Sequence, residues 1–117
     1  MSTINRQGST DMRAKAFVAA RTEGLPLPIY PGTKPDTLVE AYAIQDSAIA
    51  AFPDELSGWK VGGVNGEWRD RYGANRLFGP VFHAYTHVYH GICLEMPVFH
   101  SGFAAVEGEV TAIIAQD

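Results

Sequence analysis

The sequence lacks several features that would assign it to a particular class of protein: multiple cysteines, clustered basic residues and a long apolar run. A single cysteine, Cys93, occurs among 117 residues, which excludes an internal disulfide framework and is compatible with a reducing compartment. No stretch concentrates lysine or arginine, and the formal charge is −4, which argues against nucleic acid or an anionic membrane as the main partner. No apolar run approaches the roughly 20 residues that a membrane helix needs.

What remains is typical of one small domain, or part of one, over residues 1–117. The chain is 46% hydrophobic, and a chain of this length buries roughly two-thirds of its unfolded surface, so a core is feasible. Residues 1–9 are expected to form a loose tail. The N-terminus is polar and lacks the apolar centre of a signal peptide. We therefore expect a cytoplasmic protein, and we read Cys93 as a small buried residue.

Two helices are predicted in the first half of the chain. Residues 9–11 offer N-cap oxygens before an alanine-rich stretch, which predicts a helix over about 10–23. Thr37 and Glu40 have the spacing of a capping box, in which each side chain accepts from the other residue's backbone N–H. Apolar residues recurring on one helical face predict that this second helix continues to Phe52.

The second half has a strand-rich pattern. Strands are expected at 57–64, 85–94 and 103–115, with a short piece at 98–99, a turn or edge strand at 77–82, and a loop at 65–75. Helices first and strands afterwards predict a segregated α+β fold: a helical part over 10–56, then a strand-rich part over 57–117.

Glu107 and Glu109 are the most informative pair of residues. Residues two apart in a strand point to the same face, so both carboxylates should project together. In so hydrophobic a strand they would repel one another and lose hydration unless something pairs them. Mg²⁺ or Mn²⁺ is a suitable partner, because hard cations prefer carboxylate oxygens. The alternative is a solvated strand face carrying two surface glutamates.

Lys60 lies between a tryptophan and a valine in a glycine-rich segment, where backbone can approach a ligand closely. Such a lysine can donate a proton or clamp an anion; alternatively, it protects a strand edge. His83, His87 and His90 have spacings that mimic helical zinc ligands, but their neighbours favour strand, so no zinc site is expected.

Four motifs then occur in order: AYAIQ at 41–45, GWKVG at 58–62, GPVF at 79–82 and GFAAVEGE at 102–109. This series resembles the N-terminal part of the 2-keto-4-pentenoate hydratase group, within the fumarylacetoacetate hydrolase superfamily. The resemblance covers nearly the whole chain from the first helix onward. It implies the N-terminal part of the fumarylacetoacetate hydrolase-type fold.

The resemblance also implies a Mg²⁺- or Mn²⁺-dependent enzyme that acts on 2-oxo or 2-hydroxydienoate acids in aromatic-compound catabolism. Glu107 and Glu109 match the family's metal-binding Glu-x-Glu, and Lys60 matches a lysine implicated in substrate binding and proton transfer. The family's third metal-binding acid lies well downstream, and only Asp117 follows Glu109 among acids here. We therefore expect a truncated metal site that is inactive by itself.

Other activities remain open. Related C–C bond hydrolases and decarboxylases of 2-oxo acids share the same enolate chemistry. The fold and the metal are common to these enzymes, so they do not identify which reaction is catalysed. Hydratases often carry an acid just before the position of Gly79, where this sequence has Arg76, Leu77 and Phe78. A different alternative is a non-enzymatic remnant that folds or self-associates. Because both faces of the last predicted strand are rich in apolar groups, we expect a homo-oligomer.

Overall fold

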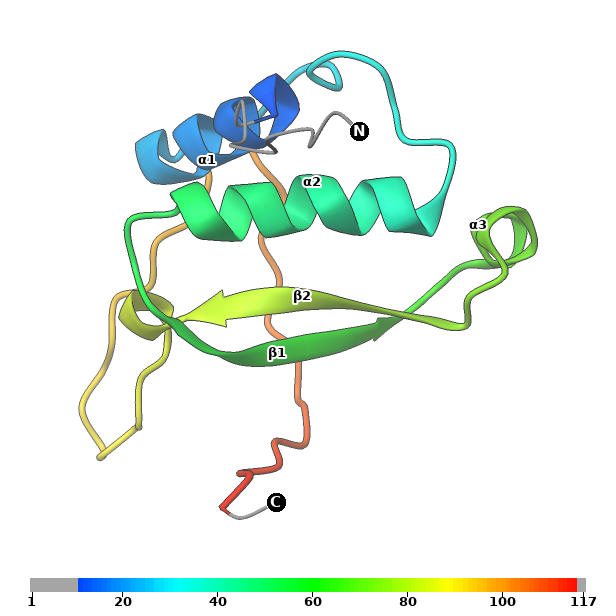
Figure 1. Ribbon diagram of the computed structural model, residues 1–117. Helices are drawn as coiled ribbons and strands as arrows, with labels where there is room; N and C mark the ends of the chain where they lie inside the picture. Colours follow the sequence, from blue (N-terminus) through cyan, green and yellow to red (C-terminus); the bar gives the residue numbers. More distant parts are fainter. Residues whose placement is uncertain (1–10, 116–117) are drawn as a thin grey trace, which may run out of the picture.

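The first helix, α1 (Met12–Glu23), begins at the predicted cap. In the computed structural model, which describes residues 11–115 (Figure 1), the Asp11 carboxylate accepts a hydrogen bond from the backbone N–H of Arg13 at 2.9 Å. The helix ends at Gly24, whose φ of 68° is a left-handed conformation that glycine adopts without strain. The predicted helix is confirmed over these residues, while its expected start at Thr10 and the tail over 1–9 lie outside the described residues.

The second helix, α2 (Leu38–Ala51), also begins at its predicted cap. Thr37 Oγ1 accepts from the backbone N–H of Glu40 at 3.2 Å. The reciprocal bond differs from the capping-box prediction, because the Glu40 carboxylate accepts from the N–H of Asp36, at 3.1 Å, rather than from Thr37. Figure 1 shows α2 lying between α1 and the sheet, so α2 is the element that joins the two.

The sheet is a two-stranded antiparallel hairpin of β1 (Leu56–Gly63) and β2 (Arg76–Phe82). Lys60 lies opposite Gly79 in its register. The predicted turn or edge strand at 77–82 is thus a full strand, and the proline in it is tolerated because both strands of a two-stranded sheet are edges.

The connection between the strands holds a third helix, α3 (Gly66–Tyr72), where the sequence predicted only a loop. That prediction was wrong for these seven residues. Glu67 lies in the first turn, and Arg69 and Arg71 lie in the last turn, an arrangement that favours the helix dipole. Gly73 ends the helix with a φ of 65°.

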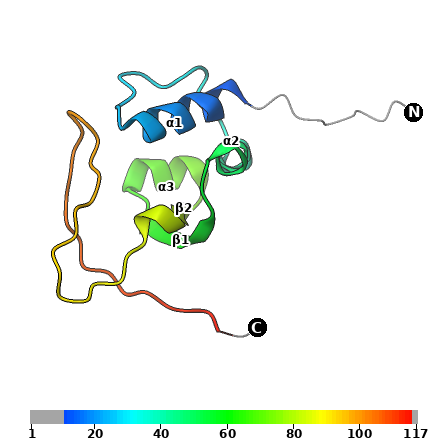
Figure 2. The ribbon, with the colours of Figure 1, turned by 90° about the vertical axis from the view of Figure 1, so that its left-hand side faces the viewer.

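The strand-rich expectation for the C-terminal half was only partly met. After the short 3₁₀ helix η1 (His83–Tyr85), residues 86–115 form neither helix nor strand, so the strands expected at 85–94, 98–99 and 103–115 are not formed. Figures 1 and 2 show this segment looping away and then crossing the hairpin instead of running alongside it. A strand needs a hydrogen-bonded partner as well as a suitable sequence, and the crossing path does not supply one. The described fold is a small α+β domain with three helices and one hairpin.

The core is small and lies where α1, α2 and β2 meet. Ala14, Ile44 and Phe82 are the buried hydrophobic residues of the described chain. The Phe82 ring stacks on Phe52 with 4.0 Å between centroids. Arg21 of α1 places its guanidinium 5.3 Å from the centroids of both of these rings, which adds a cation–π contact beside the core. Cys93 is exposed, so its predicted burial was wrong; it lies in the irregular segment that follows η1.

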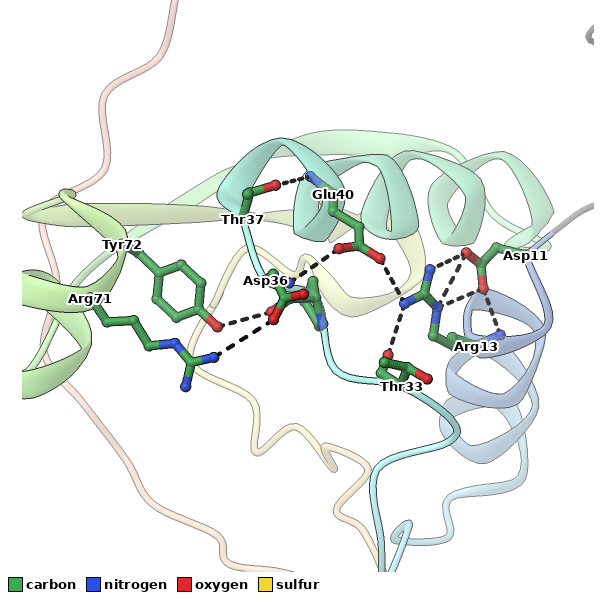
Figure 3. A network of polar contacts seen from close by, with 9 residues as sticks. Asp11, Arg13, Thr33, Asp36, Thr37, Glu40, Arg71 and Tyr72 are labelled. Carbon is green, nitrogen blue, oxygen red and sulfur yellow. Dashed lines mark hydrogen bonds and ion pairs between the residues drawn. The ribbon is translucent and has the colours of Figure 1, made fainter.

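A polar network holds α1 and α2 to the connector between them (Figure 3). The Arg13 guanidinium contacts the carboxylates of Asp11 at 2.8 Å and Glu40 at 3.1 Å, and it donates to the carbonyl oxygen of Thr33 at 2.8 Å. The guanidinium lowers the pKa of Asp11 to about 2. Through Arg13, this network joins α1 to Glu40 of α2 and to Thr33 of the connector. None of the helices in residues 11–115 combines the length and the apolarity needed to cross a bilayer.

Candidate functional site

The structure brings Lys60, Glu107 and Glu109 into one cluster. The Lys60 Nζ lies 2.9 Å from Oε2 of Glu107 and 2.6 Å from Oε1 of Glu109. The spacing of Glu107 and Glu109 predicted that these two carboxylates act together, and only the family resemblance assigned Lys60 to the same site. Their contact across 47 residues of sequence makes them the candidate functional site of this chain.

The three residues reach the cluster from two different parts of the fold. Lys60 lies within β1, held in register opposite Gly79 of β2. Glu107 and Glu109 come from the C-terminal segment, which passes on the β1 side of the hairpin in both Figure 1 and Figure 2. The two carboxylates converge on one nitrogen although their segment does not form a strand. The two glutamates therefore point in the same direction, as predicted. The strand from which that prediction was argued is not formed.

The cluster is open to solvent. The side chains of Lys60, Glu107 and Glu109 are 50%, 64% and 51% exposed. The ammonium lowers the pKa of Glu107 below its ordinary value. The pKa of Lys60 is raised, first by its hydrogen bond to Glu109 and then by the one to Glu107. Lys60 is therefore cationic at neutral pH, so it can bind an anion and cannot act as a general base in this arrangement. The two carboxylates also make it a weaker proton donor for as long as they contact it.

A divalent cation fits the cluster only in part. Two carboxylate oxygens already converge on a single positive centre, which is the donor type and arrangement that Mg²⁺ or Mn²⁺ uses. In this structure, however, the Lys60 ammonium takes the position between them. Within residues 11–115, no group of three or more His, Cys, Asp or Glu side chains is placed to hold a metal. Asp117, the remaining acid after Glu109, lies outside the described residues. A metal would thus need Lys60 to move aside and further donors from elsewhere.

A separate apolar pocket lies between α2, α3 and the hairpin, with a volume of about 250 Å³. Its lining includes Leu38, Trp68, Tyr72 and Leu77, and the Lys60 cluster forms no part of it. The pocket was not predicted from the sequence, because the residues of α3 were expected to form a loop. The available signal was the spacing of Trp68 and Tyr72, four residues apart and therefore on one helix face. Its lining has no carboxylate, imidazole or amine, and the Tyr72 hydroxyl donates a hydrogen bond to the carbonyl oxygen of Pro35 at 3.1 Å.

No protein-family model, curated protein or solved structure matches the chain. The family suggested by the four sequence motifs therefore remains a proposal, and the cluster of Lys60, Glu107 and Glu109 is the structural feature that bears on function.

Proposed function

We propose that this chain contributes the Lys60, Glu107 and Glu109 part of the site of a divalent-cation-dependent, hydratase-like enzyme acting on 2-oxo or 2-hydroxydienoate acids. One observation carries the proposal: the carboxylates of Glu107 and Glu109 converge on the Lys60 Nζ. These are the three residues to which the motif resemblance assigns metal binding and proton transfer. Two of them lie far from the third in sequence, so their meeting is not a consequence of local spacing.

Each side chain has a distinct role in this proposal. Glu107 and Glu109 would hold Mg²⁺ or Mn²⁺, which supplies Lewis-acid stabilisation of negative charge on the 2-oxygen of the bound acid. Lys60, released from the carboxylates, would keep its ammonium beside the substrate. There it would hydrogen-bond the substrate carboxylate or deliver a proton to carbon. The further metal ligand would come from outside residues 11–115.

The same cluster would serve a C–C bond hydrolase or a decarboxylase of 2-oxo acids, because those reactions also develop charge on the 2-oxygen. A second candidate function is favoured by a specific observation. Lys60 already contacts both carboxylates, so the cluster can act as a non-catalytic ion pair that ties the C-terminal segment to β1. In that case the chain is a folding or self-associating protein with no reaction of its own.

Binding of Mn²⁺ alone separates the two candidates. In a titration followed by the electron paramagnetic resonance of free Mn²⁺, we expect weak binding to the wild type and its loss in Glu109→Gln. The matched control is Glu95→Gln, which removes an exposed acid from the same irregular segment and should bind as the wild type does. Mg²⁺ should bind more weakly than Mn²⁺, which stands higher in affinity for such sites. Negligible binding to all three proteins would reject the metal role and leave the ion-pair function.

A further inference from the structure

Two of the four sequence motifs, at 41–45 and 79–82, supply no residue to the proposed site, yet the structure links both of them to it. The Tyr42 hydroxyl of α2 accepts a hydrogen bond from the backbone N–H of Phe78 at 3.3 Å. Gln45, one turn further along α2, donates from Nε2 to the carbonyl oxygen of Phe78 at 3.1 Å. The rings of Tyr42 and Phe78 also stack, with 4.6 Å between centroids. Helix α2 thus holds β2 at Phe78 through both backbone groups and the side chain.

This attachment lies beside Lys60. Gly79 follows Phe78 in β2 and lies directly opposite Lys60 in the register of the hairpin. Directly opposite residues of an antiparallel pair share one face of the sheet. On that face the Gln45 amide lies over Gly79, because a Cβ added at Gly79 would be 3.8 Å from Gln45 Nε2. Gln45 therefore holds the part of the hairpin from which Lys60 projects.

The glutamates of the cluster are attached to α1 instead. The backbone N–H of His100 donates to the carbonyl oxygen of Gly24 at 3.0 Å, which binds the C-terminal segment to the end of α1 shortly before Glu107. Helix α1 is joined to α2 by the polar network described above. The cluster is therefore built from two bodies: the hairpin carries Lys60, and the helical layer of α1 and α2 holds the segment with the glutamates. The distances within the cluster depend on how α2 sits on β2.

Gln45 is poorly suited to a role that is only stabilising. Its Oε1 is buried and has no hydrogen-bond partner within residues 11–115. A buried acceptor without a donor lowers the stability of the fold, so an apolar side chain of similar length would serve stability as well. The amide does supply one thing that an apolar side chain lacks, which is the directed bond from Nε2 to the strand beside Lys60.

We propose that Gln45 and Tyr42 are positioning residues, which place Lys60 against its two glutamates by holding β2 to α2. The four sequence motifs then form one continuous path of contacts, from α2 through the hairpin to the C-terminal segment. The catalytic meaning of this positioning rests on the proposed function. The positioning itself does not, because it concerns distances within the chain and is measured without cation or substrate.

Nuclear Overhauser effects in the full chain test this positioning, because they fall steeply with distance. In the wild type they should join the ε-methylene of Lys60 to the γ-methylenes of Glu107 and Glu109, whose oxygens contact the ammonium. Gln45→Met keeps a side chain of similar length and cannot donate to β2. The effects between Lys60 and both glutamates should weaken several-fold in this variant, while the midpoint of urea unfolding stays near that of the wild type.

A milder variant with a matched control separates positioning from loosening of the whole fold. Tyr42→Phe keeps the ring and removes the hydroxyl that accepts from β2, so it should weaken the same effects by a smaller factor. The control, Tyr72→Phe, removes a hydroxyl that donates to Pro35 and should leave them at their wild-type strength. Effects between the stacked rings of Phe52 and Phe82 report on a second contact between α2 and β2 and should persist in all variants.

Wild-type effects between Lys60 and the glutamates in Gln45→Met would overturn the proposal, as would their absence from the wild type. Their loss together with the effects between Phe52 and Phe82 in both Gln45→Met and Tyr42→Phe would also overturn it, because the two residues would then act on general stability. Failure of Mn²⁺ to bind would reject the proposed function and leave this positioning intact.

Discussion

Lys60 and Glu107 form an ion pair with 2.9 Å between Nζ and Oε2, although 47 residues separate them in the sequence. With the neighbouring contact from Glu109, this pair fastens the irregular C-terminal segment to the hairpin. The cluster thus has two capacities, to hold the segment in place and to present carboxylates to a cation.

The first prediction concerns the pKa of Glu107. Lys60→Met keeps an apolar stem of similar length and removes the ammonium, so the pKa of Glu107 should rise to its ordinary value. Carbon-detected NMR titration of the side-chain carboxyl measures this directly. The matched control, Lys34→Met, removes an exposed lysine from the connector before α2 and should leave the pKa of Glu107 lowered.

The same ion pair predicts how the C-terminal segment responds to acid. Because the folded-state pKa of Glu107 is lowered, its contribution to stability is present above the unfolded-state pKa and is lost as pH falls through the folded-state pKa. Backbone ¹⁵N relaxation over 103–115 should therefore show increasing mobility on acidification in the wild type, and mobility that is already high at neutral pH in Lys60→Met. Equal mobility of this segment in both proteins at neutral pH would show that the ion pair does not hold it.

The second prediction concerns Asp11 at the start of α1. Its pKa is lowered from 3.8 to about 2, first by the side-chain hydrogen bond from Arg13. The stabilisation is full above pH of about 4 and should be lost as pH falls towards 2. Asp11→Asn keeps a good N-cap but cannot ionise, so its far-UV circular dichroism should lack the part of the acid transition that belongs to Asp11. Identical transitions in the two proteins would contradict the role of this pair.

The third prediction concerns the small core. Ile44 is 5% exposed and lies in α2, between α1 and the hairpin. Ile44→Ala should lower the free energy of unfolding by about 3 kcal/mol, because it removes buried methyl groups and leaves a cavity. Val39→Ala changes an 82% exposed residue of the same helix and should shift it by less than about 0.5 kcal/mol. Urea unfolding of both variants measures the difference. A similar loss for the two would mean that the core is not where Ile44 lies.

The helices were predictable because their signals are local. The cap candidates at 9–11, of which Asp11 is the N-cap, and the cap at Thr37 lie next to the helices that they begin, and the structure confirms both helices. Helix α3 was missed because it has only seven residues and lies between glycines in a polar stretch, a composition that is typical of a loop. Local patterns thus identified the long helices and failed for the short one.

The strands were harder to predict than the helices, because a strand needs a hydrogen-bonded partner strand, and the residues of the strand do not show where that partner lies. The residues of 103–115 are suited to a strand, yet the described chain offers them no partner, so they cross the hairpin unpaired. The site shows the same dependence on distant residues. Spacing explained why Glu107 and Glu109 act together, but nothing local placed them against Lys60.

Coupling between Mn²⁺ and oxalate tests most directly whether the Lys60 cluster is a site for 2-oxo acids. Oxalate offers two adjacent oxygens like the 1-carboxylate and 2-oxygen of the enolate form. In the wild type, oxalate should strengthen Mn²⁺ binding several-fold, because each ligand then favours the other. Lys60→Met should bind Mn²⁺ alone more tightly, since the competing ammonium is gone, and should lose the strengthening by oxalate. If oxalate only strips Mn²⁺ from the wild-type chain, the account of this cluster as a 2-oxo acid site is contradicted.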